Sequence, residues 1–292
     1  MPEGDSVWRA ASQLHQALSG QKLIASDFRV PRFATLNLAG WTVEEVVPRG
    51  KHLLMRVQGP DDQKLTIHSH LKMEGAWQVY PPGGRWRKPG FTARCVLRTA
   101  TADAVGFSLG IVEVVRTADE DSIVGYLGPD LLGPDWDPAE AERRILAAPN
   151  VPIGVALLDQ RNLAGIGNVY RCESCFLSGL HPASPVSAVP DLVALITDAK
   201  QLLEANLGSG RRTTVLDSRG NPRGNPRGNP GGIPVGMSAR RMPRPAGYWV
   251  YGREHRPCLR CGTPIRRDVL GKPNGEEERD IFFCPQCQPL LS

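Results

Sequence analysis

The chain of 292 residues contains 41% hydrophobic and 22% charged residues, a composition typical of a globular protein with room for about two domains. No apolar stretch reaches the ~18 residues that a membrane helix needs, and no basic and apolar signal segment stands at the start. These features exclude membrane, collagen-like and fully disordered proteins. We therefore expect a cytoplasmic location.

The net charge of +5 is unevenly distributed along the chain. Residues 1–135 carry 15 basic and 15 acidic side chains, whereas residues 208–292 carry 15 basic and 7 acidic ones. Of the 15 cations in this last third, 14 are arginines, which bind phosphate through two parallel hydrogen bonds. Charge alone leaves two interpretations open, a nucleic-acid-binding segment and an arginine-rich solvated tail.

The first helix is predicted from apolar residues at helical spacing between Val7 and Leu18, with Gly20 as a stop. Between residues 22 and 116 the pattern changes to short β-rich runs separated by Gly, Pro and Asp turns. This pattern predicts an antiparallel sandwich or barrel. The predicted strands are Lys22–Val30, Trp41–Val47, His52–Val57, Lys64–Ser69, Phe91–Arg98 and Ile111–Arg116.

A turn-rich hinge at residues 128–138 separates the strands from a helical part of the chain. The predicted helices are Ala139–Ala147, Ile153–Asp159, Asn168–Leu177 and Asp191–Asn206. Residues 208–247 then lose periodicity, and the unit Arg-Gly-Asn-Pro occurs three times in succession from Arg219 to Pro230. Such a segment buries too little apolar surface to offset its ordering entropy, so we expect a mobile loop. It is either a tolerated repeat expansion or a segment that follows a phosphate backbone.

Four of the seven cysteines form two Cys-x-x-Cys pairs that are typical of a structural metal site. Two such pairs complete the tetrahedral coordination of one Zn²⁺ ion, which predicts a zinc ribbon with Asp280–Phe283 as the strand before its second pair. The predicted ligands are Cys258, Cys261, Cys284 and Cys287. A third pair, Cys172 and Cys175, lies in a predicted helix without further ligands nearby. We interpret these two and Cys95 as core residues.

Four separated segments carry a resemblance to a known family. The chain begins with Pro2-Glu3 after its Met, and Arg49-Gly50-Lys51 precedes a predicted strand. Leu163–Glu173 is a glycine-hinged turn between two helices, and Arg279 stands five residues before the second cysteine pair. In this order, with a zinc ribbon at the end, the chain closely resembles the formamidopyrimidine-DNA glycosylase / endonuclease VIII family of base-excision repair enzymes. The resemblance extends from Pro2 to Gln288 and fails mainly in the arginine-rich loop.

The resemblance implies a multidomain α+β fold that holds damaged DNA between its domains. Residues 1–130 are then an N-terminal β-sandwich with flanking helices, and residues 138–207 a helical helix–two-turn–helix domain. Residues 208–247 form the Arg/Gly/Pro-rich mobile loop, and residues 248–292 form the zinc-finger domain. We expect a monomeric protein that works at the bacterial nucleoid.

The implied activity is that of a bifunctional DNA glycosylase and abasic-site lyase. Once Met1 is removed, Pro2 presents a secondary amine that is roughly a quarter to two-fifths neutral at pH 7.5. Its place ahead of a helix lowers its pKa further, because the positive helix end disfavours a cation. Such an amine can attack the sugar C1′ of a damaged nucleotide, release the base and form a Schiff base. The resemblance implies that the strand is then broken by elimination.

The other site residues are carried over from the family position by position. Glu3 matches the general acid that protonates the opening sugar ring; the alternative is a helix-start carboxylate favoured by the helix dipole, and the two roles are compatible. Lys51 matches the lysine that contacts phosphate and assists departure of the base. Asn168 and Arg279 match phosphate contacts, with a helix cap and a solvated arginine as alternatives.

His68–Gly75 resembles the family loop in which a methionine fills the space of the flipped nucleotide. Met73, and with it Leu71, is the candidate wedge, and His70 a candidate phosphate contact. The alternative for Met73 and His70 is an ordinary place in the core.

Two departures from the family pattern bear on the lesion. Val105–Gly110 stands where the oxidised-guanine branch carries an arginine pair, and the repeat region bears little likeness to the lesion-capping loop of that branch. A third departure, Ser6 in place of a second glutamate found in many members, concerns the proton-transfer role of that glutamate. The sequence thus favours the endonuclease VIII branch, which acts on oxidised pyrimidines and abasic sites. The remaining alternatives are an oxidised-purine (formamidopyrimidine) glycosylase and a catalytically silent DNA-binding zinc protein on the same scaffold.

Overall fold

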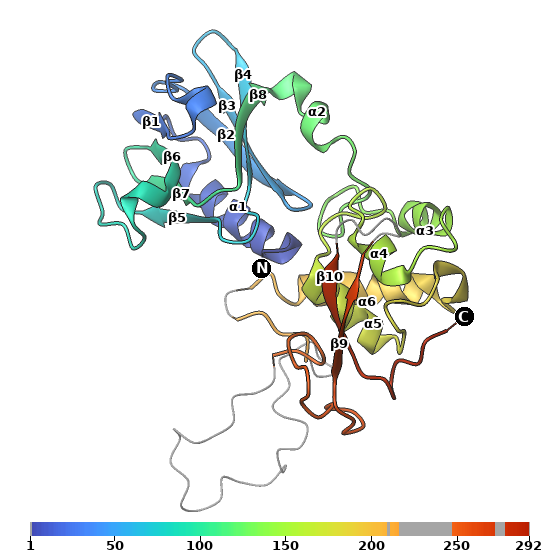
Figure 1. The fold of residues 1–292 in the computed structure, drawn as a ribbon. Coiled ribbons are helices and arrows are strands. Elements are labelled where there is room, and N and C mark those ends of the chain that lie inside the picture. The colour runs from blue at the N-terminus through green and yellow to red at the C-terminus, as the bar shows by residue number, and fades with distance from the viewer. Residues whose placement is uncertain (1, 209–210, 216–246, 272–277, 292) are drawn as a thin grey trace, which may run out of the picture. The chain divides into compact units, whose positions relative to one another are not determined.

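The computed structural model describes residues 2–208, 211–215, 247–271 and 278–291. The Arg-Gly-Asn-Pro repeat lies outside these residues. The chain divides into two compact units (Figure 1), one of residues 1–137 with 160–167 and one of residues 138–159 with 168–292. Within the described residues, no helix is both long and apolar enough to cross a membrane.

The first unit begins with helix α1 (Gly4–Leu18) and contains two four-stranded antiparallel sheets (Figure 1). One sheet has the order β2-β3-β4-β8 and the other β1-β6-β7-β5. The strands are β1 (Ala25–Phe28), β2 (Thr42–Arg49), β3 (His52–Gln58), β4 (Lys64–His70), β5 (Ala76–Tyr80), β6 (Ala93–Arg98), β7 (Asp103–Phe107) and β8 (Ile111–Arg116). The predicted sandwich is therefore confirmed, whereas β5 and β7 were not predicted.

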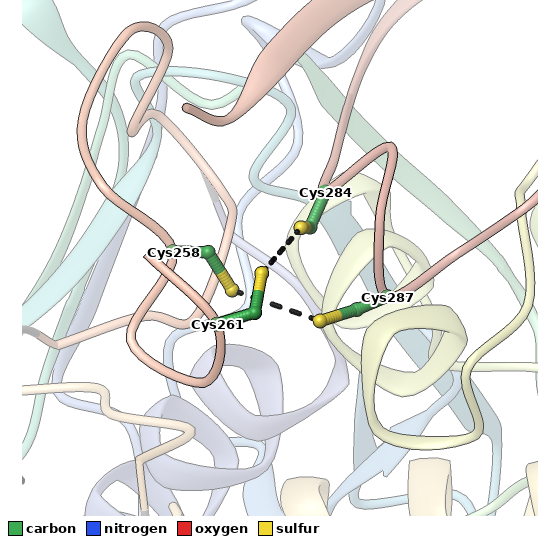
Figure 2. Close-up of side chains that lie close together, drawn as sticks. All are labelled: Cys258, Cys261, Cys284 and Cys287. Carbon is green, nitrogen blue, oxygen red and sulfur yellow. Dashed lines mark hydrogen bonds between the residues drawn. The ribbon is translucent and has the colours of Figure 1, made fainter. Parts of the chain in front are cut away.

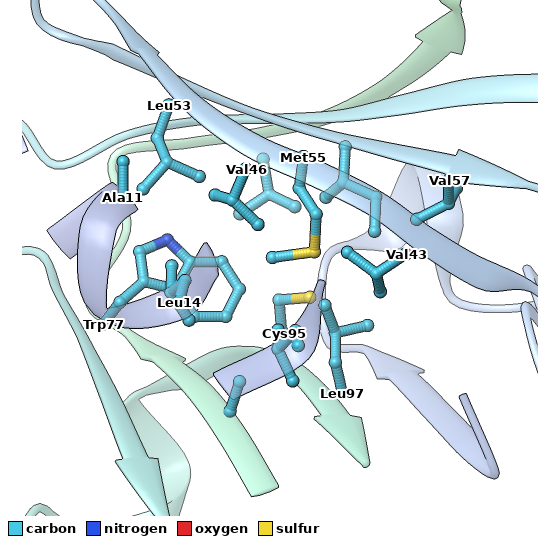
Figure 3. Packing of buried hydrophobic residues seen from close by; sticks show 14 of the residues in the cluster. Ala11, Leu14, Val43, Val46, Leu53, Met55, Val57, Trp77, Cys95 and Leu97 are labelled. Carbon is cyan, nitrogen blue, oxygen red and sulfur yellow. The ribbon is translucent and has the colours of Figure 1, made fainter. Parts of the chain in front are cut away.

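A single apolar core joins α1 to both sheets of this unit (Figure 3). The helix contributes its buried apolar stripe, and alternate residues of each strand enter the core because successive side chains point to opposite faces. The residues labelled in Figure 3 are Ala11, Leu14, Val43, Val46, Leu53, Met55, Val57, Trp77, Cys95 and Leu97. This packing fixes the helix whose first turn follows Pro2 and Glu3.

The short helix α2 (Asp121–Val124) completes the first unit. Single-turn 3₁₀ helices occur in both units, at Pro31–Phe33, Gly90–Thr92, Thr117–Asp119 and Val186–Ala188.

The second unit contains four helices and one antiparallel hairpin in its described residues. These are α3 (Pro138–Leu146), α4 (Ile153–Leu158), α5 (Asn168–Leu177), α6 (Leu192–Glu204), β9 (Arg266–Leu270) and β10 (Arg279–Phe283). Nearly every residue of α5 is buried, because it packs against α4, α6 and β10. The helices confirm the predicted positions within one or two residues. The core formed by α5 and β10 supports the cysteine ribbon.

Glu173, on α5, fastens the chain segment that enters the ribbon. Its fully buried carboxylate accepts hydrogen bonds from the backbone nitrogens of Trp249 (2.7 Å), Val250 (2.9 Å) and Tyr251 (2.8 Å). It also accepts a hydrogen bond from the Thr214 hydroxyl. Four donors from two segments thus converge on one side chain, so the helix and the start of the ribbon are held together by polar groups that have no access to water.

We expect Glu173→Ala to lower the free energy of unfolding by at least about 3 kcal/mol, because it strands buried backbone N–H groups. Glu204→Ala is the matched control on α6, since it removes only the surface ion pair with Lys200, worth less than about 1 kcal/mol. Urea unfolding of both variants measures the difference. Equal losses would contradict the assignment.

Candidate functional site

The start of the chain is fixed to the glycine-hinged turn within the first unit. Glu3 is the N-cap residue of α1, but its carboxylate makes no capping hydrogen bond. The side chain is fully buried and accepts a hydrogen bond from the backbone nitrogen of Gly167 at 2.8 Å. The Gly4 nitrogen donates to the Gly165 carbonyl at 2.9 Å. Pro2, partly exposed, stands directly before this fastened segment.

The two glycines of the turn are required by the closeness of these contacts. A Cβ on Gly167 would lie 2.5 Å from the Glu3 carboxyl carbon. Gly4 and Gly165 approach so closely that a Cβ on Gly4 would lie 3.1 Å from the Gly165 Cα. A side chain at position 4 or 167 would displace these neighbours, and Gly165 has φ +109°, a conformation that side-chain-bearing residues rarely adopt. The glycines in residues 163–168 therefore allow the turn to approach and hold Glu3.

Lys51 lies in the two-residue turn between β2 and β3. Gly50, its neighbour, has φ +56° and donates its backbone N–H to the Asp130 carboxylate at 2.6 Å. A Cβ on Gly50 would lie 3.0 Å from the Ala164 Cβ, so this turn packs against the same glycine-hinged segment. Arg49 is held by an ion pair with Asp135 at 2.6 Å. The structure thus brings the segments of Pro2, Glu3 and Lys51 to residues 163–167.

Asp130 is a site residue that the sequence prediction missed. It is buried, accepts from the backbone nitrogens of Gly50 and Leu132, and burial raises its pKa. The sequence around it, Gly128-Pro129-Asp130, indicated only a hinge. Its partner Gly50 lies 80 positions earlier in the chain, so no local pattern could reveal the contact.

The loop after β4 presents Met73 and withdraws Leu71. Met73 is 66% exposed, as an inserting wedge requires, whereas Leu71 is buried in the sandwich core. Leu71 is therefore unsuited to the wedge role considered for it. His70 ends β4, where its Nδ1 accepts from the Lys72 backbone nitrogen at 2.9 Å and its ring contacts His52 edge-on.

In the second unit, Asn168 and the residue next to Arg279 are in direct contact. The Asn168 amide donates to the Asp280 carbonyl at 2.8 Å, and Arg279 begins β10 immediately before it with an exposed side chain. Arg171, which is fully buried, donates to the Asn168 side-chain oxygen and to the same carbonyl. The two predicted phosphate contacts thus share one edge. Arg171, read from the sequence only as part of a helix, orients the Asn168 amide.

The four ribbon cysteines converge on one point (Figure 2). Their sulfur atoms all lie within 4.8 Å of one another, with 3.5 Å between Cys261 and Cys284 and 4.0 Å between Cys258 and Cys287. Four sulfurs at ~2.3 Å from a tetrahedral ion are about 3.8 Å apart, so the arrangement fits one metal ion. Across the described ranges, this is the one cluster of potential ligands close enough to hold a metal.

The other three cysteines are core residues, as predicted. Cys95, Cys172 and Cys175 are fully buried. Burial raises the pKa of Cys172 to about 11 and that of Cys175 to about 12, and it raises the pKa of Cys95 as well. These thiols are therefore neutral and inaccessible at physiological pH.

We expect a thiol reagent to distinguish the two groups of cysteines. After chelation of metal from the native protein, four thiols per chain react, and the remaining three react only after addition of denaturant. Counting released chromophore against time gives both numbers, and peptide mapping assigns them. Early labelling of Cys172 or Cys175 would contradict their assignment to the core.

Comparison with known proteins identifies the family. Residues 1–108 match the N-terminal domain of formamidopyrimidine-DNA glycosylase, and residues 127–217 match the H2TH domain of the same enzyme. The chain is 50% identical to a probable endonuclease 8 2 of Streptomyces coelicolor, over 99% of this chain and 94% of that protein. It is 42% identical to the DNA-(apurinic or apyrimidinic site) lyase Nei2 of Mycolicibacterium smegmatis, over 99% of both chains.

The fold is shared with a solved relative. Formamido-pyrimidine DNA glycosylase of Lactococcus lactis, crystallised with DNA containing an abasic site, matches with a TM-score of 0.72 at 22% identity. The match covers 99% of this chain and all of that one. The chain therefore belongs to the formamidopyrimidine-DNA glycosylase / endonuclease VIII family, and the resemblance inferred from the sequence is confirmed. The relatives named above that are at least 40% identical carry endonuclease 8 or Nei2 names.

Proposed function

We propose that this protein is a bifunctional DNA glycosylase and abasic-site lyase of base-excision repair. It removes oxidised bases, principally pyrimidines, through a Schiff base on Pro2 and nicks the strand by elimination. The observation that carries the proposal is the buried Glu3 carboxylate, held by Gly167 directly beside Pro2. Relatives named as endonuclease 8 and as an abasic-site lyase support the same activity.

In the proposed reaction, the free amine of Pro2 is the nucleophile. Helix α1 begins two residues later, and its positive end favours the neutral amine that attack on C1′ requires. Glu3 is the proton donor to the sugar ring, and Lys51 contacts a phosphate and assists departure of the base. The hydrogen bond from Gly167 to Glu3 and that from Gly50 to Asp130 fix the backbone of both segments.

The second unit supplies the phosphate contacts. The Asn168 amide has one N–H in the bond to the Asp280 carbonyl and a second N–H that can bind a phosphate oxygen. Arg279 is exposed at the same edge and clamps the backbone around the lesion. Met73 fills the space of the extruded nucleotide, and His70 contacts phosphate.

Zinc is the metal that we propose for the cysteine cluster. Four thiolates at tetrahedral spacing are the donor set of a closed structural zinc site. One ion there would hold residues 258–287 as a ribbon and keep Arg279 at its edge. The ion would have no part in the chemistry, because a site with four protein ligands has no open position.

The preference for pyrimidines rests on residues 105–110. They lie in β7 and the turn after it, and Val105 and Phe107 are fully buried in the sandwich. This stretch offers no arginine side chain to a base, unlike its counterpart in the oxidised-guanine branch.

Every group that the reaction needs is on one chain, so we propose a monomer, acting on nucleoid DNA in the cytoplasm. Residues 138–207 and 248–292 hold the DNA, and residues 208–247 connect them.

A panel of duplex oligonucleotides, each with one defined lesion, tests the proposal. We expect nicking at oxidised pyrimidines and at abasic sites. Nicking at formamidopyrimidine lesions is expected to be at least about tenfold slower. Faster cleavage of the oxidised purines would assign the protein to the other branch. Tight binding to all duplexes without nicking would identify a silent DNA-binding protein instead.

A further inference from the structure

Three histidines lie together on the outer face of the sheet β2-β3-β4-β8. His52 pairs with His70 across β3 and β4, and His68 pairs with Glu113 across β4 and β8. Residues 52, 68 and 70 alternate with the core residues of the same strands, such as Leu53, so they occupy the opposite face. His52 and His68 are nonetheless buried, at 8% and 1% exposure. None of the roles proposed above uses His52, His68 or Glu113.

Two of these histidines form a chain of hydrogen bonds with a single direction, together with Glu113 of β8 and Tyr126, which follows α2. Glu113 lies 3.1 Å from His68 Nδ1, His68 Nε2 lies 2.8 Å from His52 Nδ1, and His52 Nε2 lies 3.1 Å from the Tyr126 hydroxyl. An ionised carboxylate only accepts, so Nδ1 of His68 carries the proton and its Nε2 accepts. His52 Nδ1 then donates, and its Nε2 accepts from Tyr126. The Glu113 carboxylate, which can only accept, thus determines the position of every proton in this series of hydrogen bonds.

The surroundings keep both imidazoles neutral, as this direction requires. Burial, reinforced by neighbouring histidines and by the charges of Lys51 and Lys72, lowers the pKa of His52 to about 3. Burial also lowers the pKa of His68, although the hydrogen bond to Glu113 opposes it. A proton on the second nitrogen of His68, Nε2, would place two N–H groups face to face, 2.8 Å apart. The relay is therefore intact throughout the physiological pH range.

His52 is the residue at which this relay meets the proposed site. It follows Lys51 directly and pairs with Arg49 across the β2–β3 hairpin, so it closes the two-residue turn that carries Lys51. Hydrogen bonds at both ring nitrogens allow one orientation of the ring only. Leu54, two residues on, packs under Leu127 in the segment that contains Tyr126. The relay therefore fastens the exit of the turn, as Asp130 fastens its entrance through Gly50.

We propose that Glu113, His68, His52 and Tyr126 form a directional hydrogen-bond relay that positions Lys51. These are positioning residues, and the proposal rests on the function proposed above for Lys51. The relay extends from the far strand of the sheet to the turn, so a change at Glu113 reaches Lys51 through two imidazole rings.

The tautomers can be observed directly. Nitrogen NMR of the ¹⁵N-histidine-labelled protein at pH 7 is expected to show His52 and His68 neutral with the proton on Nδ1. This is the minor tautomer of free histidine, so the result does not arise by default. A proton on Nε2 of either ring would overturn the relay. The Phe of His68→Phe has no nitrogen to accept the hydrogen bond from His52 Nδ1. In this variant, His52 is expected to lose its preference for the Nδ1–H tautomer.

Two substitutions of Glu113 separate the effect of its hydrogen bond from the effect of its side-chain size. Glu113→Gln keeps a carbonyl acceptor for His68 Nδ1, whereas Glu113→Leu removes it at similar size. We expect backbone amides of residues 50–52 to exchange with deuterium at least about tenfold faster in Glu113→Leu than in Glu113→Gln, which should resemble wild type. This readout needs no enzymatic activity. Equal exchange in both variants would overturn the positioning role even if the protein proved not to be a lyase.

A double-mutant cycle tests the connection to Lys51. Glu113→Leu is expected to lower the single-turnover nicking rate on an abasic duplex by on the order of 10-fold to 100-fold, the cost of a misplaced catalytic group. In a Lys51→Ala background the same substitution should change the rate less than about twofold, because its target is gone. Equal losses in both backgrounds would refute a path through Lys51. Failure of the wild type to nick would refute the proposed function and leave the exchange result to decide the relay.

Discussion

Borohydride added to the protein and a duplex with one abasic site is expected to join the two covalently at Pro2. The secondary amine adds to the C1′ aldehyde and loses water, and hydride reduces the resulting iminium to a stable amine. Peptide mapping by mass spectrometry then places the DNA remnant on the first peptide of the chain. We expect trapping in proportion to the fraction of chains that have lost Met1.

The geometry of the first unit explains why Pro2, rather than a lysine, is expected to react. Its α-amine is substantially neutral near pH 7.5, whereas a lysine amine of ordinary pKa is almost entirely protonated. The Glu3 N-cap and the Gly4 contact to Gly165 fix the first turn of α1. The proposed nucleophile therefore stands on an anchored segment, with the proposed proton donor as the adjacent residue.

Acylation of Pro2 provides the decisive change. Insertion of Leu between Met1 and Pro2 retains the initiator Met and converts the amine to an amide, which cannot form an iminium. We expect trapping and nicking to fall by at least about 10³-fold, as when a nucleophile is removed from other enzymes. The controls are the Kd for the abasic duplex and the thermal midpoint of unfolding. The Kd is expected to stay within a small factor of the wild-type value, and the thermal midpoint is expected to stay close to that of wild type. An adduct that persists and maps to Lys51 would give the nucleophilic role to that residue.

The strands predicted from the sequence are those with clear turn residues at both ends. β3, β4 and β8 were predicted within a residue or two, because alternation and flanking Gly, Pro and Asp identify them. β7 was missed because all five of its residues are buried and the alternation is absent. Its Gly106 sits where a Cβ would meet Leu109 and Trp77, so a residue that weakens strand propensity is required by tertiary packing.

The residues proposed for the chemistry were visible in the sequence, whereas the residues that hold them were not. Glu3 and Lys51 stand in short motifs, but the partner of Glu3 is a backbone nitrogen 164 positions away. Asp130 stands in a segment that indicated only a hinge. His68 opens the loop segment His68–Gly75 but had no role of its own there, and a buried histidine is ordinarily a core residue. Asp130 and His68 are recognised by their hydrogen-bond partners on other segments of the chain. These partners depend on how the segments pair, which is set only when the chain folds.

Removal of one ribbon thiol is expected to release the metal and abolish stable DNA binding together. Cys284→Ser leaves three thiolates, and a structural zinc site of this kind contributes about 10–16 kcal/mol of binding energy to folding. We expect bound zinc to fall from one ion per chain to less than about a tenth. Plasma emission spectrometry measures the metal, and exchange of residues 247–271 with deuterium measures the loss of structure.

Arg279→Ala is the matched change that keeps the ribbon. Arg279 is exposed and its guanidinium donates only to the neighbouring Glu278 carbonyl among the bonds found in the described chain, so its loss leaves one zinc per chain. We expect DNA affinity to fall with it and the salt dependence of binding to weaken by about one phosphate contact. Equal zinc content in Cys284→Ser and Arg279→Ala would contradict the division between metal ligand and DNA contact.

Cys175→Ala completes the argument, because its Cys-x-x-Cys spacing is the same as that of the ribbon pairs. Spacing alone would make Cys172 and Cys175 ligands, yet both are buried on α5, and the four clustered sulfurs belong to other residues. The variant is therefore expected to keep its zinc and its DNA binding and to lose only the stability of a small core cavity, about 1 kcal/mol. Loss of zinc from Cys175→Ala would show that the pair on the helix, rather than the ribbon alone, holds metal.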